Sequence, residues 1–287
     1  MKNPEYLTDQ AIAAFIERAL AEDVGDGDHS TLAAVPPNAV NRAKLLIKGQ
    51  GMLAGMDMAR HIFRHIDPRL SVEALKEDGD EVAFGDIGLY VSGPSQGILT
   101  AERLVLNCMQ RMSGIATYTN RMVEKLKGSK TKILDTRKTT PNFRLMEKWA
   151  VHIGGGHNHR FGLYDMVMLK DNHIDYAGGI TRAVESTAAY LEKTGKSLRI
   201  EVETRNLREV EEALNTGKVD IIMLDNMTYS MMKDAVEMID GRAETEASGG
   251  ITIETIREVA DCGVDFISVG ALTHSIRSID ISLKACE

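Results

Sequence analysis

The chain has 287 residues, enough for one large domain or two of ordinary size. It carries 34 basic and 42 acidic residues, and a formal net charge of −8 argues against a general nucleic-acid-binding surface, which needs a net basic face. Cys108, Cys262 and Cys286 lie far apart, so we expect no disulfide framework, no cysteine zinc site and a reducing cytoplasm. No apolar run reaches the roughly 18 residues of a membrane span, and we see no export signal.

The first third of the chain mixes helical and strand patterns. Thr8 is a predicted N-cap, because the apolar residues Ile12, Phe15 and Ile16 follow it at helical spacing. Residues 43–47 alternate in the manner of a half-buried strand. The remaining predicted elements are a helix over 59–66, strands at Val72 to Leu75 and Leu89 to Val91, and a long helix that starts near Thr100 and loosens at Gly114.

From Thr131 onward, short apolar runs alternate with helical patterns, which predicts βα units and a parallel sheet. Six runs are too few for the eight strands of a standard (β/α)8 barrel, so a smaller or open barrel is favoured. An open doubly wound sheet is the alternative. The runs are Lys132 to Leu134, Met166 to Leu169, Leu198 to Val202, Ile221 to Leu224, Glu244 to Ala247 and Phe266 to Val269.

All six predicted strands end in polar residues or glycine. In parallel α/β architectures ligands bind at the carboxyl ends of the strands, so these positions are candidate site residues. In chain order they are Asp135, Thr136, Arg137 and Lys138; Lys170, Asp171 and Asn172; Glu203; Asp225 and Asn226; Ser248, Gly249 and Gly250; and Gly270.

Basic side chains crowd the segment from Asp135 to His173. A single cation there would be an ordinary solvated loop charge, but together they predict a site for a ligand with several negative charges. Lys170 directly follows the apolar run MVML, so its ammonium group should begin inside the barrel mouth and needs an anionic partner. The basic residues are Arg137, Lys138, His157, His159, Arg160 and Lys170.

The stretch HIGGGHNHR could be only a flexible linker. Three adjacent glycines also allow a ligand to approach the backbone closely, while His157, His159 and Arg160 supply donors. A zinc site made by His152, His157 and His159 is not favoured, because they match no known zinc motif and the neighbouring cations would repel the metal.

Two late loops, ASGGI and SVGALTHS, contain the glycines that let backbone N–H groups hold a phosphate. Turns between helices and strands use glycine anyway, so one such loop would be weak support. Because the loops follow consecutive strands, we predict a terminal phosphate as their ligand.

Two carboxylates are predicted to face the basic residues. Glu201 and Glu203 lie on the same face of one strand, with Glu203 nearer its carboxyl end. With Asp225 on the next strand, Glu203 forms a pair suited to a divalent cation or to a developing positive charge. The alternative is a structural salt bridge to Lys138 or Lys170.

Arg103 stands apart from this cluster. The pattern TAERLVLNCMQRM places it in the first turn of a helix, where a cation opposes the helix dipole. The negative charge of Glu102 could offset the unfavourable interaction of Arg103 with the helix dipole. The functional interpretation is that Arg103 reaches an anionic ligand, including one in another subunit.

The order of the motifs TAERLVLN, DTRKTTP, GGGHNHR, MLKDNH, EVET, LDN, ASGG and VGALTHS closely resembles the quinolinate phosphoribosyltransferase family. EDVGDGDHST resembles that family's EDxGxGDxT segment, so the resemblance covers nearly the whole chain. His29 and Ser30 replace a less polar pair that is often seen there.

The resemblance implies an α/β protein with an N-terminal α/β sandwich domain, residues 1–114, and an open six- or seven-stranded α/β barrel, residues 115–270, of the type II phosphoribosyltransferase kind. Residues 271–287 are expected to return to the N-terminal domain. Such enzymes are homodimers or larger assemblies in which one subunit's N-terminal domain caps the partner's barrel. This would bring Arg103 to the partner's site, where a guanidinium suits a carboxylate.

The implied activity is that of a pentosyltransferase in NAD biosynthesis. It joins quinolinate to phosphoribosyl pyrophosphate, giving nicotinate mononucleotide, pyrophosphate and CO2, with Mg²⁺ held by Glu203 and Asp225. The residues matched to quinolinate are Arg103, Arg137, His159, Arg160 and Lys170. Those matched to phosphoribosyl pyrophosphate are Thr136, Lys138, Asn158, Ser248, Gly249, Gly250, Gly270 and Ala271. Lys138, Lys170, Glu203 and Asp225 are the expected catalytic residues.

Three other interpretations remain at this point. One is a paralogue of the same fold associated with molybdenum transport, although the presence of Arg103, Arg137 and Arg160 favours quinolinate. Another is a lyase that forms a Schiff base through Lys170 or Lys138. The third is a non-catalytic phosphosugar-binding protein.

Overall fold

The computed structural model describes residues 4–286 and divides them into two compact units. Residues 1–3 of the predicted N-terminal domain and residue 287 of the predicted C-terminal segment lie outside the described residues. The N-terminal unit contains the chain up to residue 120 together with 139–155 and the segment from 272 onward. The barrel unit contains 121–138 and 156–271, so one short segment inside the predicted barrel belongs to the N-terminal unit.

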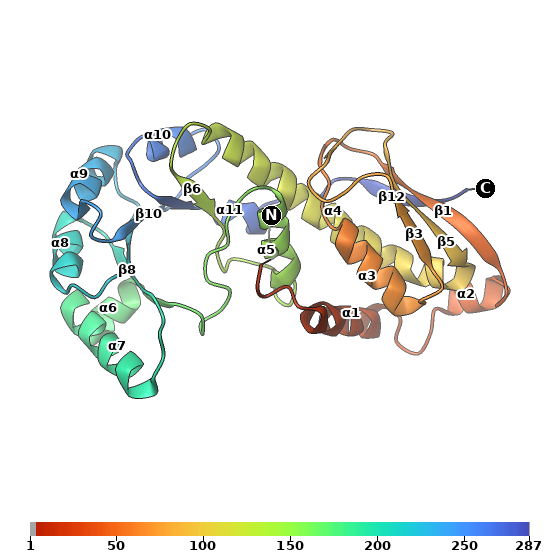
Figure 1. Cartoon of the computed structure of the whole chain (residues 1–287), viewed down its shortest axis with the longest axis horizontal. Helices are drawn as coiled ribbons and strands as arrows, with labels where there is room; N and C mark the ends of the chain where they lie inside the picture. The colour runs from red at the N-terminus through yellow and green to blue at the C-terminus, as the bar shows by residue number, and fades with distance from the viewer. Residues whose placement is uncertain (1–3, 287) are drawn as a thin grey trace. The chain divides into compact units, whose positions relative to one another are not determined.

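An antiparallel sheet with the strand order β12-β1-β5-β3 forms the centre of the N-terminal unit (Figure 1). Ala43, Leu45 and Ile47 are buried on alternate positions of β1, as the sequence predicted, because one face of the strand packs on the core. Leu283 of the last strand pairs with Leu45. The strands of this unit are β1 (Val40–Ile47), β2 (Gly51–Met52), β3 (Ser71–Ala74), β4 (Glu81–Val82), β5 (Ile87–Pro94) and β12 (Ile281–Cys286).

Helices of the N-terminal unit follow the predicted apolar patterns. Thr8 caps the first helix, and its Oγ1 accepts a hydrogen bond of 3.1 Å from the backbone N–H of Ala11, which confirms the predicted N-cap. These helices are α1 (Asp9–Asp23), α2 (His29–Ala34), α3 (Met56–Ile66), α4 (Ser95–Lys125, whose last turns belong to the barrel unit), α5 (Arg144–Ile153) and α11 (Ala271–His274, which begins at the end of the barrel unit).

The long helix α4 corrects two predictions. It begins at Ser95 rather than near Thr100, so Arg103 lies in its third turn and the argument from the helix dipole is wrong. Its side chain is exposed. The helix also continues through Gly114 instead of loosening there. This glycine is needed for packing, since an added Cβ would lie 2.5 Å from the carbonyl oxygen of Arg277.

The barrel unit contains six parallel strands in the order β6-β11-β10-β9-β8-β7, and all six predicted runs are strands. Among the described residues the edge strands β6 and β7 do not pair, so the barrel is open, as predicted. The strands are β6 (Lys132–Leu134), β7 (Val167–Leu169), β8 (Ile200–Thr204), β9 (Ile221–Asp225), β10 (Glu244–Ser248) and β11 (Phe266–Ser268).

Helices cover the outer side of this curved sheet (Figure 1). Val210 and Ala213 of α8, and Met232, Ala235 and Ile239 of α9, are buried, because each helix has one apolar face. The helices are α6 (Asp171–Ala177), α7 (Ile180–Thr194), α8 (Leu207–Asn215), α9 (Tyr229–Ile239) and α10 (Ile256–Ala260). None of the helices in the described part of the chain is long and apolar enough to cross a membrane.

Replacing Gly114 with alanine should destabilise the protein by about 1–3 kcal/mol, because the new methyl group would overlap the backbone of residues 277 and 278. Gly97→Ala in the same helix is the matched control. There the new methyl would lie 3.3 Å from the flexible tip of Leu70 and 3.4 Å from Asp67 Cβ, without overlapping any backbone atom, and alanine favours the helix. Urea unfolding of both variants measures the difference, and equal stability would contradict the packing role of Gly114.

Candidate active site

A cavity of about 480 Å³ opens at the carboxyl ends of the barrel strands. Most of the residues predicted from the strand ends line it, so the sheet gathers segments that are far apart in the sequence. The predicted residues that line it are Thr136, Arg137, Lys138, His159, Arg160, Lys170, Asp171, Glu203, Asp225 and Ser248. Met168, Met223, Glu246 and Ser268 complete the lining.

The basic residues come from the segments that follow the two edge strands. Arg137 and Lys138 follow β6, and Lys170 ends β7 and precedes α6. Burial lowers the pKa of the Arg160 guanidinium, and the nearby positive charge of Arg137 lowers it further. Two guanidinium groups that repel each other in a partly buried site favour an anionic ligand.

The buried carboxylate of Asp135 holds the glycine loop against the end of β6. Its oxygens accept hydrogen bonds from the Asn158 amide at 2.6 Å and from the backbone N–H of His159 at 2.9 Å. Backbone pairing of Leu134 with His157 continues this contact. The predicted role of Asn158 in substrate binding therefore competes with a structural one, and Asn158 does not line the cavity.

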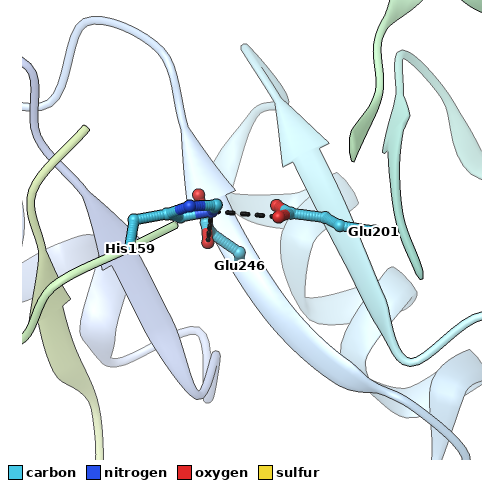
Figure 2. Close-up of side chains that lie close together, drawn as sticks. All are labelled: His159, Glu201 and Glu246. Carbon is cyan, nitrogen blue, oxygen red and sulfur yellow. Dashed lines mark ion pairs between the residues drawn. The ribbon is translucent and has the colours of Figure 1, made fainter. Parts of the chain in front are cut away.

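A cluster of three ionisable groups lies beneath the cavity, as Figure 2 shows. The His159 Nε2 atom is 2.9 Å from a Glu201 oxygen and 3.3 Å from a Glu246 oxygen. Both glutamates are completely buried, and the His159 side chain is only 6% exposed. Glu201 and Glu246 point into the barrel from the middle of β8 and β10.

The two carboxylates of the cluster stabilise the protonated form of His159. Burial alone would lower the pKa of His159, but hydrogen bonds and charges from Glu201 and Glu246 outweigh it and raise the pKa to about 9. Burial raises the pKa of Glu201. In the neutral ring, the His159 Nδ1 atom accepts the backbone N–H of Arg160 at 2.7 Å, and the ring proton is then on Nε2 between the carboxylates.

That arrangement bears on metal binding. The three ligand atoms lie within 4.8 Å of one another, a spacing that would suit a metal ion. However, a metal would need the Nε2 lone pair and would have to displace the proton that Glu201 and Glu246 stabilise on the ring. The cluster is therefore better suited to holding a proton than a metal.

Glu203 and Asp225 form the second acidic group, at the ends of the neighbouring strands β8 and β9. Burial raises the pKa of Glu203, and the charge of Asp225 raises it further. The charge of Lys170 lowers the pKa of Glu203 without offsetting these two effects, and the structural salt bridge to Lys138 or Lys170 stays a prediction. Two repelling carboxylates facing a cavity fit a cation better.

Asn226, a candidate residue from the end of its strand, fixes one of these carboxylates. Its amide donates to Asp225 Oδ2 at 2.7 Å, and its backbone has a φ of 53°, in the left-handed region that asparagine tolerates. Gly249 packs against it so closely that an added Cβ would lie 2.2 Å from the Asn226 Oδ1. Gly249 therefore makes room for Asn226, which is a different role from the predicted phosphate contact.

Other predicted residues lie outside the cavity lining. Gly250, Gly270 and Ala271 lie on the loops that follow β10 and β11, beside the lining residues Ser248 and Ser268. Arg103 is on α4 in the N-terminal unit.

Glu246 is the opposite case, since it lines the cavity but was missed. Its signal was the spacing of Glu246 and Ser248, which repeats that of Glu201 and Glu203 on another strand.

Substituting Glu201 with glutamine should lower the pKa of His159 from about 9 toward its ordinary value of 6.5, because a principal hydrogen-bond acceptor loses its charge. The stabilising effect is fully present below pH 6.5 and is lost as the pH rises through about 9. The stability advantage of the wild type over the variant should therefore shrink over this pH range.

Ring NMR signals of His159 followed against pH measure this shift. Glu244→Gln, at the start of the same strand as Glu246 and paired with Arg199, is the control and should leave the His159 titration unchanged. An unaltered titration in Glu201→Gln would contradict the cluster.

Comparison with known proteins agrees with this geometry. Residues 28–113 match the family model described as "Quinolinate phosphoribosyl transferase, N-terminal domain", and residues 115–284 match that of the C-terminal domain. The chain is 50% identical to the chloroplastic nicotinate-nucleotide pyrophosphorylase [carboxylating] of Arabidopsis thaliana, over 99% of this chain and 85% of the relative. A probable enzyme of the same name from Bacillus subtilis is 40% identical, over 91% of this chain and 89% of the relative.

Solved structures give the same result. The crystal structure of NadC from Streptococcus pyogenes is 40% identical, with a TM-score of 0.90 over 98% of this chain and 99% of the other. The nicotinate-nucleotide pyrophosphorylase of Francisella tularensis is 38% identical, with a TM-score of 0.87 over 98% of each chain. The similarity covers both units and the whole of the candidate site, and the chain belongs to the quinolinate phosphoribosyltransferase family.

Proposed function

We propose that the cavity of the barrel unit is where this chain transfers a phosphoribosyl group from phosphoribosyl pyrophosphate to quinolinate. The products are nicotinate mononucleotide, pyrophosphate and CO2, and the reaction is a step of NAD biosynthesis. The observation that carries the proposal is one cavity in which Arg137, Arg160 and Lys170 face Glu203 and Asp225. Both substrates are polyanions, and the transition state develops a positive charge.

Quinolinate would bind among the cations. Its two carboxylates fit the guanidinium groups of Arg137 and Arg160, which can each form paired hydrogen bonds, and the ammonium of Lys170. Binding would also relieve the repulsion between the two arginines. His159 was matched to quinolinate as well, but both ring nitrogens already have partners within the protein. We assign it the role of holding Arg160 in place through the backbone N–H.

Phosphoribosyl pyrophosphate would bind across the remaining strand ends. Lys138 and Thr136 would hold the pyrophosphate, and Ser248 with the backbone N–H groups at Gly250, Gly270 and Ala271 would hold the 5′-phosphate. These loops follow β6, β10 and β11, which are neighbours in the sheet. The ribose would then lie toward β9 and β8, where Asp225 and Glu203 end their strands.

In the transfer step, the pyridine nitrogen uses its lone pair to form a bond to C1 of the ribose. The bond from C1 to pyrophosphate breaks, and the pyrophosphate leaves with the electron pair. C1 gains oxocarbenium character as this happens, and the carboxylates of Glu203 and Asp225 stabilise it. The barrel holds two anions together against their mutual repulsion, which removes much of the entropic cost of their meeting.

Decarboxylation follows from the charge on the ring. Once the nitrogen is quaternary, the adjacent carboxylate leaves as CO2, and its bonding electrons remain on the ring carbon. The ring cation stabilises this carbanion, and a proton from solvent then takes the vacated position. The protein needs only to hold the remaining carboxylate in place, which we assign to the cations around Arg160.

We propose Mg²⁺ as the cation at Glu203 and Asp225. Their oxygen atoms are the ligands that Mg²⁺ prefers, and burial and the charge of Asp225 raise the pKa of Glu203 more than the charge of Lys170 lowers it. When bound, Mg²⁺ would neutralise charge on the pyrophosphate group. The residues would hold it directly or through water.

A homodimer is also part of the proposal. Arg103 is exposed on the outer surface of α4, beside the buried Leu104 and Val105. A guanidinium in this position is available to a neighbouring subunit. We therefore propose that Arg103 binds quinolinate in the partner's cavity.

A cytoplasmic location stays a proposal, supported by three dispersed free cysteines. Plant relatives are named as chloroplastic or mitochondrial proteins.

Purified protein supplied with quinolinate, phosphoribosyl pyrophosphate and Mg²⁺ should form nicotinate mononucleotide and CO2 in equal amounts. Borohydride added during turnover should trap no substrate on Lys138 or Lys170, whereas a Schiff-base lyase would be labelled there. Nicotinate is the matched substrate control, since it lacks the carboxylate that leaves. Turnover of nicotinate but not quinolinate would overturn the assignment.

Co-expressed Arg103→Ala and Lys170→Ala chains should give hybrid dimers with about half the wild-type activity, because one of the two sites is then intact. Each variant alone should be nearly inactive. The control pair, Arg137→Ala with Lys170→Ala, should show no rescue, because both changes lie in the same barrel. Hybrids without activity would count against a shared site.

A further inference from the structure

A buried ion pair in the N-terminal unit holds the ends of two loops that lead into the cavity. Arg111 on α4 donates from Nε to Glu147 Oε1 at 3.1 Å and from Nη2 to the same oxygen at 2.9 Å. Glu147 on α5 is completely buried, and the Arg111 side chain is 24% exposed. Neither residue lines the cavity of the barrel unit.

Glu147 holds the first loop. Its Oε2 accepts the backbone N–H of Thr140 at 3.0 Å, and its Oε1 accepts the Thr140 hydroxyl at 2.9 Å. Thr140 is two residues beyond Lys138 in the motif DTRKTTP. A second contact, from Arg144 Nε to Thr139 Oγ1 at 3.0 Å, fixes the residue between them.

Arg111 holds the second loop. Its guanidinium donates to the carbonyl oxygen of Thr273 and, at 3.3 Å, to that of Ile276. Thr273 is two residues beyond Ala271 and three beyond Gly270 in the motif VGALTHS. The N–H of Ile279, which donates to the Gln110 carbonyl at 3.1 Å, ties the same segment to α4.

The ion pair of Arg111 and Glu147 therefore joins the segments at Thr140 and Thr273, which are 133 residues apart in the sequence. A completely buried carboxylate costs several kcal/mol of desolvation unless its partners compensate for it. Here the partners are one guanidinium and the two donors of Thr140, so removing any of them leaves buried groups unsatisfied. The position of both loop ends follows from this geometry.

We propose that Arg111 and Glu147 are positioning residues for phosphoribosyl pyrophosphate. They fix Lys138 and the Gly270–Ala271 loop at the spacing that the pyrophosphate and the 5′-phosphate require. This inference rests on the proposed function of those two loops. The binding of quinolinate should depend less on this ion pair, because Asp135 and His173 hold the segments that carry Arg160 and Lys170.

Glu147→Gln tests this proposal most directly. Glutamine keeps the shape but removes the charge, and its amide group would face the Thr140 N–H with a donor. We expect the KM for phosphoribosyl pyrophosphate to rise about tenfold or more, in keeping with the loss of a charge-assisted hydrogen bond. The KM for quinolinate should change less than about threefold.

Thr140→Val provides a milder second variant, since it removes only the hydroxyl of an exposed residue. It should raise the same KM by a few fold, while Thr140→Ser should keep wild-type kinetics. Trp149, the single tryptophan, is buried two residues beyond Glu147 and reports whether α5 stays packed. Its emission maximum should not change in any of these variants.

Asp78→Asn is the matched control for a purely structural effect. Asp78 is also a carboxylate in the N-terminal unit, and it accepts the N–H of Met56 at 2.8 Å at the start of α3. The variant should lose stability with both KM values unchanged. If Glu147→Gln and Thr140→Val behave in the same way, or raise both KM values equally, the positioning role is overturned. A wild type without any turnover would instead refute the proposed function.

Discussion

The site depends on keeping opposite charges in one cavity without letting them neutralise each other. Glu203 and Asp225 face the same cavity as Arg137, Lys138, Arg160 and Lys170. An ion pair between these groups would satisfy them and leave little affinity for ligands. The charges reach the cavity from different strands, since β8 and β9 carry the carboxylates, while the segments after β6 and β7 carry the cations.

Holding unneutralised charges in place requires a second set of contacts that do not touch the ligand. Asp135 fixes the glycine loop, Asn226 fixes Asp225, and the cluster around His159 fixes the backbone of Arg160. The hydrogen bonds of Asp135 and of His159 are partly buried, and their loss would leave polar groups unsatisfied. These contacts limit the side-chain freedom that the site would otherwise lose upon binding.

The sequence predicted the frame of the site well, because the position of a strand and the residue that ends it are local properties. All six barrel strands lie where apolar runs are found, and ten of the residues chosen at the strand ends and in the glycine loop line the cavity. The N-cap at Thr8 has the same local origin. Family motifs then supplied the reaction, which charge patterns alone left open.

Residues that act through long-range contacts were not predictable in this way. The spacing of Glu246 and Ser248 marks a shared strand face, but the contact of Glu246 with His159 depends on the position of β10 in the sheet. Arg111 meets Glu147 across 36 residues, and no periodicity points to that pair. The start of α4 was placed too late, near Thr100, so the helix-dipole argument for Arg103 was wrong.

Calorimetric binding of three pyridine carboxylates tests the central claim that the cations are reserved for two carboxylates on one ring. Quinolinate carries both carboxylates, whereas nicotinate and picolinate each carry one. We expect quinolinate to bind at least about tenfold more tightly than either, since each carboxylate would gain a charge-assisted contact. Equal affinity for quinolinate and nicotinate would contradict the account.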